Sequence, residues 1–65
     1  MDEHEQTQLI LGRVTKWAGS RENAQKWFDQ EFIPALGSTT KHAVEHGYYE
    51  AVNDYLDAIE LGGFA

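Results

Sequence analysis

The sequence predicts a small all-α domain of about four short helices with a Gly-rich C-terminal tail. Apolar residues recur at helical spacing in several stretches. Capping residues and glycines separate these stretches. No stretch shows the sustained alternation or the hairpin dipeptides that indicate strands. Sixty-five residues make one domain at most, so we treat residues 1–65 as a single helical unit.

The first helix is predicted to begin at about Thr7, because residues 1–6 are polar and are expected to be flexible. Gly12 weakens this helix by about 1 kcal/mol relative to alanine. Gly19 suits its C-terminal cap. The apolar positions that fall at helical spacing here are Ile10, Leu11, Val14, Trp17 and Ala18.

A second helix is predicted to start at Ser20, a favoured N-cap residue, with Glu22 in its first turn. The stretch Gln30-Glu31-Phe32-Ile33-Pro34 ends it, because the residue before a proline is driven out of the helical region. The apolar face of this helix consists of Ala24, Trp27 and Phe28.

The C-terminal half is predicted to contain a turn at residues 35–38 and two further helices. Thr39 or Thr40 can cap a short third helix, and Gly47 stops it. The fourth helix ends at Gly62 and Gly63. Its apolar stripe consists of Tyr48, Val52, Tyr55, Leu56 and Ile59. We expect the core of the domain to centre on Trp17, Trp27, Phe28, Leu36, Val52, Leu56 and Ile59.

Composition and charge favour a protein partner over a nucleic acid or a membrane. The net charge is −6, and residues 34–65 contribute most of it, with five acidic residues against Lys41. Such a chain repels phosphate backbones and attracts basic proteins. The chain has no cysteine, no apolar run long enough for a membrane span and no signal peptide, so a cytoplasmic location is expected. A core this small also favours a homodimer or hetero-oligomer.

An ordered set of short motifs resembles the toxin-binding domain of Xre/MbcA/ParS-type antitoxins. The resemblance covers about residues 13–65. It rests on Ala24-x-x-Trp27-Phe28, on Pro34-Ala35-Leu36-Gly37, on Thr40 and Gly47, and on Val52-x-x-Tyr55-Leu56-x-x-Ile59-x-x-Gly62-Gly63-Phe64-Ala65. Three features depart from the family: Lys41 replaces the usual proline after the capping threonine, the third helix is about a turn short, and residues 1–65 leave no room for the usual N-terminal DNA-binding domain.

The resemblance implies a protein-binding inhibitor that neutralises a RES-domain toxin, an enzyme that consumes NAD. In such complexes the C-terminal tail of the antitoxin lies across the active site of the toxin. Carried over to this chain, the tail consists of Gly62, Gly63, Phe64 and Ala65, with Ile59 and Leu61 at its root. The inhibitor itself requires no cofactor.

The residues of the fourth helix suggest a docking surface. Tyr49 falls off the apolar stripe and is expected to contact the partner, since tyrosine is enriched in binding hot spots. Glu50, Asp54 and Asp57 share a ridge that is either a solvated face or a docking surface for a basic protein. With Leu61 and the tail, these residues complete the predicted partner-binding set.

Other constellations have simpler explanations. His42 and His46 fit the H-x-x-E-H pattern of some zinc enzymes, but the chain offers neither a third ligand at a suitable spacing nor a scaffold of the required size. We therefore expect ordinary surface histidines and no enzyme. Trp17, Trp27 and Phe28 are expected to be core residues instead of a base-stacking platform. Two alternatives to the antitoxin remain: an acidic phage-type nucleic-acid mimic, and a dimerisation module from a larger regulator.

Overall fold

Two helices, α1 (Glu3–Ala18) and α2 (Arg21–Gln30), form the N-terminal half of the computed structural model, which describes residues 2–63. Gly19 lies between them with a φ of 94°, and its N–H donates to the Thr15 carbonyl. The Ser20 side chain then accepts the Asn23 N–H at 3.1 Å and caps α2. Both caps are where the sequence predicts them, because glycine and serine suit these positions.

The start of α1 differs from the prediction. The helix begins at Glu3, and not at about Thr7. The Asp2 side chain accepts the Glu5 N–H at 2.8 Å, which satisfies one of the unpaired donors of the first turn. Glu3 and Glu5 also place negative charge at the positive end of the helix dipole. The polar composition of residues 2–6 therefore extends the helix, although it gives no apolar periodicity.

A short hairpin follows α2, and the expectation that no strand is present is wrong at this point. Strands β1 (Phe32–Ile33) and β2 (Ser38–Thr39) pair antiparallel, with Phe32 opposite Thr39 and Ile33 opposite Ser38. Strands of two residues are too short to produce a detectable alternation. The turn between them closes through the Leu36 and Gly37 N–H groups, which both donate to the Ile33 carbonyl at 2.9 Å.

The second half continues with α3 (Thr40–Glu45), α4 (Tyr49–Ala58) and a π-helical turn, η1 (Ile59–Gly63). Thr39 caps α3, because its side chain accepts the His42 N–H at 3.2 Å. Gly47 follows α3 with a φ of 83°, a left-handed conformation that glycine adopts without strain. Gly62 and Gly63, which the sequence analysis assigns to the C-terminal tail, lie within this π-helical turn.

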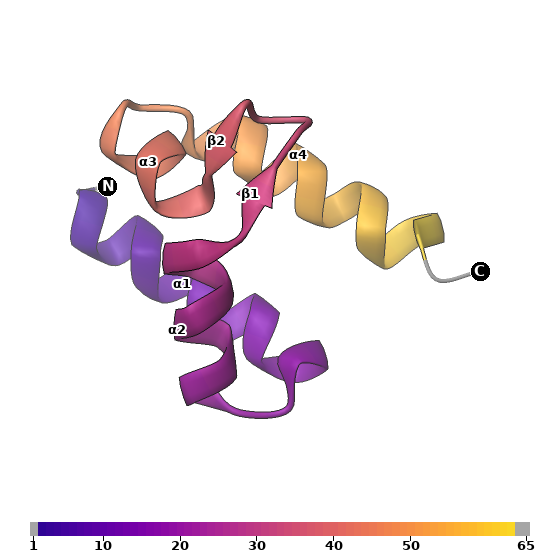
Figure 1. Ribbon diagram of the computed structural model, residues 1–65. Helices are drawn as coiled ribbons and strands as arrows, with labels where there is room; N and C mark the ends of the chain where they lie inside the picture. Colours follow the sequence, from indigo (N-terminus) through magenta and orange to yellow (C-terminus); the bar gives the residue numbers. More distant parts are fainter. Residues whose placement is uncertain (1, 64–65) are drawn as a thin grey trace.

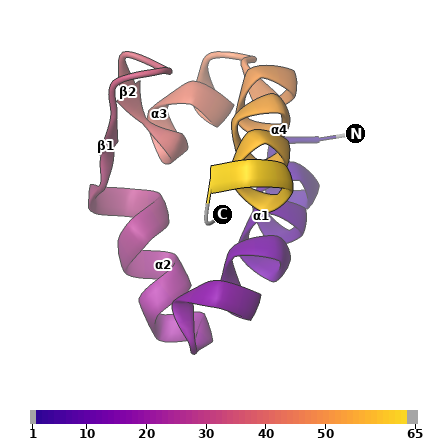
Figure 2. The same cartoon turned by 90° about the vertical axis from the view of Figure 1, so that its right-hand side faces the viewer.

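Figure 1 shows the helices in their spatial arrangement, with α1 and α2 packed as a pair and α4 crossing the other side of the domain. Viewed along α4 in Figure 2, α1 and α4 lie side by side, whereas α2 and the hairpin lie opposite them. The described residues thus form a small all-α domain, as the sequence predicts. The short hairpin, with two residues in each strand, is the feature that the sequence does not predict. No helix within residues 2–63 combines the length and the apolar character that crossing a bilayer requires.

The core lies where α1, α2, α3 and α4 meet. Its buried apolar cluster consists of Ile10, Leu11, Val14, Ala24, Phe28, Ala43, Val44, Val52 and Leu56. Phe28, Val52 and Leu56 are confirmed as central core residues, whereas Trp27, Leu36 and Ile59 are only partly buried and pack against the cluster. The sequence predicts Trp17 in the core, but this residue is 36% exposed, so that prediction is wrong. It lies in the last turn of α1, where it packs edge-to-face on Trp27 with ring centroids 5.5 Å apart.

Tyr48 and Tyr49 exchange the roles that the sequence suggests. Tyr48 belongs to the predicted buried stripe, but it is 60% exposed. Tyr49 is expected at the surface, but it is partly buried and packs against the core. Tyr48 is the N-cap of α4 and lies outside the helical phase, so the buried stripe begins at Tyr49 and continues at Val52, Leu56 and Ile59. Tyr49 lies three residues before Val52 and so shares its face of the helix, whereas the N-cap residue Tyr48 does not follow the helical period.

Candidate functional site

The outer face of α4 is the candidate surface. Val52 and Leu56 turn one side of the helix into the core. The opposite side carries Glu50 and Asp54, four residues apart and both exposed. Ala51 and Ala58 are exposed on one side of them. This exposed face is therefore acidic.

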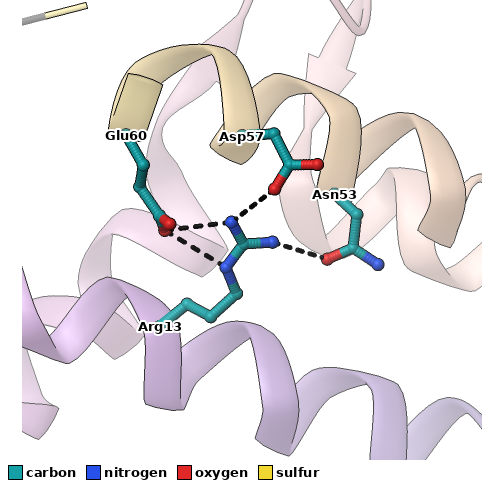
Figure 3. A network of polar contacts seen from close by, with 4 residues as sticks. All are labelled: Arg13, Asn53, Asp57 and Glu60. Atoms are coloured by element: carbon teal, nitrogen blue, oxygen red, sulfur yellow. Dashed lines mark hydrogen bonds and ion pairs between the residues drawn. The ribbon is translucent and has the colours of Figure 1, made fainter. Parts of the chain in front are cut away.

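Asp57, the third member of the predicted ridge, is turned toward α1. Figure 3 shows the Arg13 guanidinium of α1 among three side chains of α4 and η1. Its Nη2 donates to Asp57 Oδ1 at 2.8 Å, and its Nη1 donates to Asn53 Oδ1 at 3.0 Å. Glu60 Oε2 lies 3.1 Å from Nε and 3.0 Å from Nη2. A single arginine thus joins three successive turns of the C-terminal helix to α1.

This network changes the composition of the candidate surface. The hydrogen bonds to Glu60 first, and to Asp57 second, raise the pKa of the Arg13 guanidinium above its ordinary value. Because a charged arginine already offsets Asp57 and Glu60, their attraction for a basic partner is weakened. Within residues 2–63, Glu50 and Asp54 are in no ion pair. The acidic ridge therefore consists of Glu50 and Asp54, not of three equivalent carboxylates.

Sequence reasoning missed Arg13. The signal was present, because Asn53, Asp57 and Glu60 recur at i, i+4 and i+7 and form a polar stripe beside the apolar one. If this polar stripe lies where two helices pack, its two carboxylates require a cation from the neighbouring helix to offset their charge. However, five basic residues are available, and only the packing of α1 against α4 decides which of them lies opposite the stripe.

The C-terminal end of this surface is apolar. Leu61 is 88% exposed in η1, which makes it the most exposed large apolar side chain among the described residues. Gly62 and Gly63 complete the π turn. The remaining two members of the predicted tail, Phe64 and Ala65, lie outside the described residues. Tyr49 is partly buried and packs against the core, and Tyr48 is the exposed tyrosine at the other end of α4.

The histidine pair and a surface hollow are two further features of the described residues. His42 and His46 lie on α3 and its C-terminal cap, with their rings stacked at a centroid distance of 4.1 Å. In the part of the chain that the structure describes, no group of three or more histidine, cysteine or acidic side chains is placed to hold a metal ion. A shallow hollow between α1, α2 and α3 has Phe28 and Val44 in its lining and Glu3, Asp29, Glu45 and Lys41 among its polar residues. Its described lining contains no cysteine, serine or histidine nucleophile.

Comparison with known proteins adds no relative. No protein-family model matches this chain, and neither does any curated protein or any solved structure.

Proposed function

We propose that this protein is an antitoxin-like, protein-binding inhibitor without enzymatic activity. In this proposal it neutralises a RES-type, NAD-consuming toxin in the cytoplasm. The outer face of α4 docks on a basic surface of the toxin, and the C-terminal tail covers the toxin's active site. The motif resemblance in residues 13–65 supports the identity of the partner. The geometry of α4 supports the mode of binding.

One observation carries the docking mode: two exposed carboxylates lead along α4 to an exposed apolar side chain. Glu50 and Asp54 are in no ion pair among residues 2–63, and Leu61 is 88% exposed in the following turn. Charged groups at a rim accelerate association, whereas an apolar anchor contributes most when a pocket desolvates it. A basic cleft with an apolar floor is the complementary shape, and an active site for a charged dinucleotide has this character.

Charge reversal on α4 tests the docking face. We expect the double variant Glu50→Lys, Asp54→Lys to fold, because both side chains are exposed, and to lose binding to a co-expressed RES-domain toxin in a pull-down. Glu22→Lys, Glu31→Lys is the matched control, since it makes the same change in net charge at exposed positions on and beside α2. Equal retention of the toxin by both variants would exclude the outer face of α4 as the docking surface.

The tail is tested separately from the docking face. Removal of Phe64 and Ala65 leaves η1 complete, so we expect the truncated chain to bind the toxin. We also expect it to fail to rescue the growth of cells that express the toxin, because the active site is left uncovered. Full rescue by the truncated chain would show that docking through α4 inhibits without the tail.

The acidic face also supports the alternative of a phage-type nucleic-acid mimic. Glu50 and Asp54 place two negative charges one helical turn apart, and a basic groove that normally holds phosphates would attract them. A mimic needs no tail, so its inhibition would survive the loss of Phe64 and Ala65 but not charge reversal on α4. Loss of inhibition on truncation therefore supports the tail-dependent inhibitor and excludes the mimic, whereas inhibition that survives truncation fits both the mimic and inhibition by α4 docking alone.

A further inference from the structure

His42 and His46 form a pair that the proposed function does not use. His42 lies in α3 and His46 is its C-cap, so the two residues are one helical turn apart. The His46 N–H donates to the His42 carbonyl at 3.1 Å, which fixes their backbones relative to each other. Both side chains are exposed, and their rings stack at a centroid distance of 4.1 Å with 28° between the ring planes.

We propose that His42 and His46 chelate one Zn²⁺ ion. A tetrahedral zinc ion with two imidazole ligands at about 2.0–2.1 Å places the ligand nitrogens roughly 3.3 Å apart. Two histidines at i and i+4 on a helix can direct one nitrogen each toward such an ion. The ring centroids lie 4.1 Å apart, so both imidazoles are on the same side of α3 and near enough to each other to share one ion. Because both rings are exposed, binding requires no rearrangement of the core.

The chemistry of the pair suits zinc. Glu45 lies on α3 between the two histidines in sequence and adds one negative charge to this helix. Imidazole ligands select zinc over magnesium, which prefers oxygen. Since no third protein ligand within residues 2–63 joins the pair, at least two coordination positions stay open for water or for a ligand from a partner. The site is therefore an open one, and it is independent of the docking face on α4.

Titration of the tag-free, EDTA-treated full chain with ZnCl₂, followed by NMR of the imidazole resonances, tests the proposal. The chain has three histidines, and His4 in α1 serves as an internal control. We expect the resonances of His42 and His46 to change together at the same zinc concentration, while those of His4 do not. We expect MgCl₂ at the same concentration to leave all three unchanged. Equal responses of His4 and the pair, or no response at all, would overturn the proposal.

Single substitutions distinguish a chelate from two separate ligands. We expect His42→Gln and His46→Gln each to weaken zinc binding about tenfold or more, because the second ligand of a chelate binds intramolecularly. His4→Gln should leave the affinity unchanged. If either variant of the pair keeps the affinity of the unmodified chain, one histidine binds alone and the chelate is excluded. Circular dichroism of each variant verifies the fold.

Discussion

At the scale of single residues, Thr40 is the buried polar side chain that the described core leaves unsatisfied. It has no exposed surface, and its Oγ1 has no hydrogen-bond partner within residues 2–63. A buried hydroxyl without a partner carries a desolvation cost of about 1–3 kcal/mol. Its neighbour Thr39 differs, since the Thr39 hydroxyl accepts the His42 N–H and caps α3. Adjacent threonines therefore have opposite energetic roles.

We predict that Thr40→Val stabilises the domain by about 1 kcal/mol, because a methyl group replaces a hydroxyl that has no partner. The matched change Thr39→Val should destabilise the domain by about 1 kcal/mol, because it removes the N-cap of α3. Urea denaturation followed by circular dichroism measures both values. A loss of stability in Thr40→Val would show that its hydroxyl is satisfied after all.

At the scale of elements, α1 contains an exposed glycine within its length. Gly12 lies in the middle of the helix, and a Cβ atom built there meets no atom within 4 Å. We predict that Gly12→Ala raises the free energy of unfolding by about 1 kcal/mol. Gly19→Ala should lower it by about 1 kcal/mol, although its site is equally open, because Gly19 has a φ of 94°. Thermal melts that show the same sign for both alanine variants would contradict this account.

The Arg13 network is the second feature at this scale, because it joins α1 to α4 and η1. We predict that Arg13→Met destabilises the domain by about 1 kcal/mol, a modest value because the arginine side chain is 27% exposed and its partners are more exposed still. The difference should shrink in 1 M NaCl, since salt screens the partly exposed charges.

Lys16→Met is the control for this prediction. It removes the same charge from the same helix. Lys16 lies in the last turn of α1, where a cation interacts favourably with the helix dipole and stabilises the helix by about 0.3 kcal/mol. Denaturation at low and high salt compares the two variants. If Lys16→Met and Arg13→Met cost the same, net charge is responsible and the network contributes nothing of its own.

At the scale of the whole molecule, the domain is compact but small. Its radius of gyration is 10.9 Å, close to the value of about 11 Å expected for a folded chain of this length. Yet several large apolar side chains remain exposed, with Tyr48 60%, Phe32 58% and Leu9 49% accessible. A domain of this size gains little from its core alone, and association is a common way to add buried surface.

We therefore predict that the isolated chain self-associates to at least a dimer at tens of micromolar. Sedimentation equilibrium in buffer with EDTA measures the mass, and the chelator separates this association from any bridging by zinc. A monomer mass that does not change with concentration would exclude self-association. In that case a different protein, such as the toxin, would be the partner that buries the exposed apolar side chains.

Much of the fold follows from local sequence. Gly19, Ser20, Thr39 and Gly47 are the caps and stops that their residue types predict, because each acts through hydrogen bonds or backbone conformation within a few residues. The same local reasoning misplaced the start of α1, since the Asp2 cap lies outside the apolar pattern. It also misassigned Tyr48 and Tyr49, because Tyr48 is the N-cap of α4, so the helical period that places Val52 and Leu56 in the core does not extend to it.

The sequence by itself therefore determined the helical class, the positions of most helix ends and the acidic character of the C-terminal half. Tertiary structure alone decided which charges remain available. Glu50, Asp54 and Asp57 look equivalent along the chain, but Asp57 pairs with Arg13, which lies 44 residues away in the sequence. The physical reason is range: caps and helical periodicity act over a few residues, whereas an ion pair depends on how two helices pack, and no local pattern records that packing.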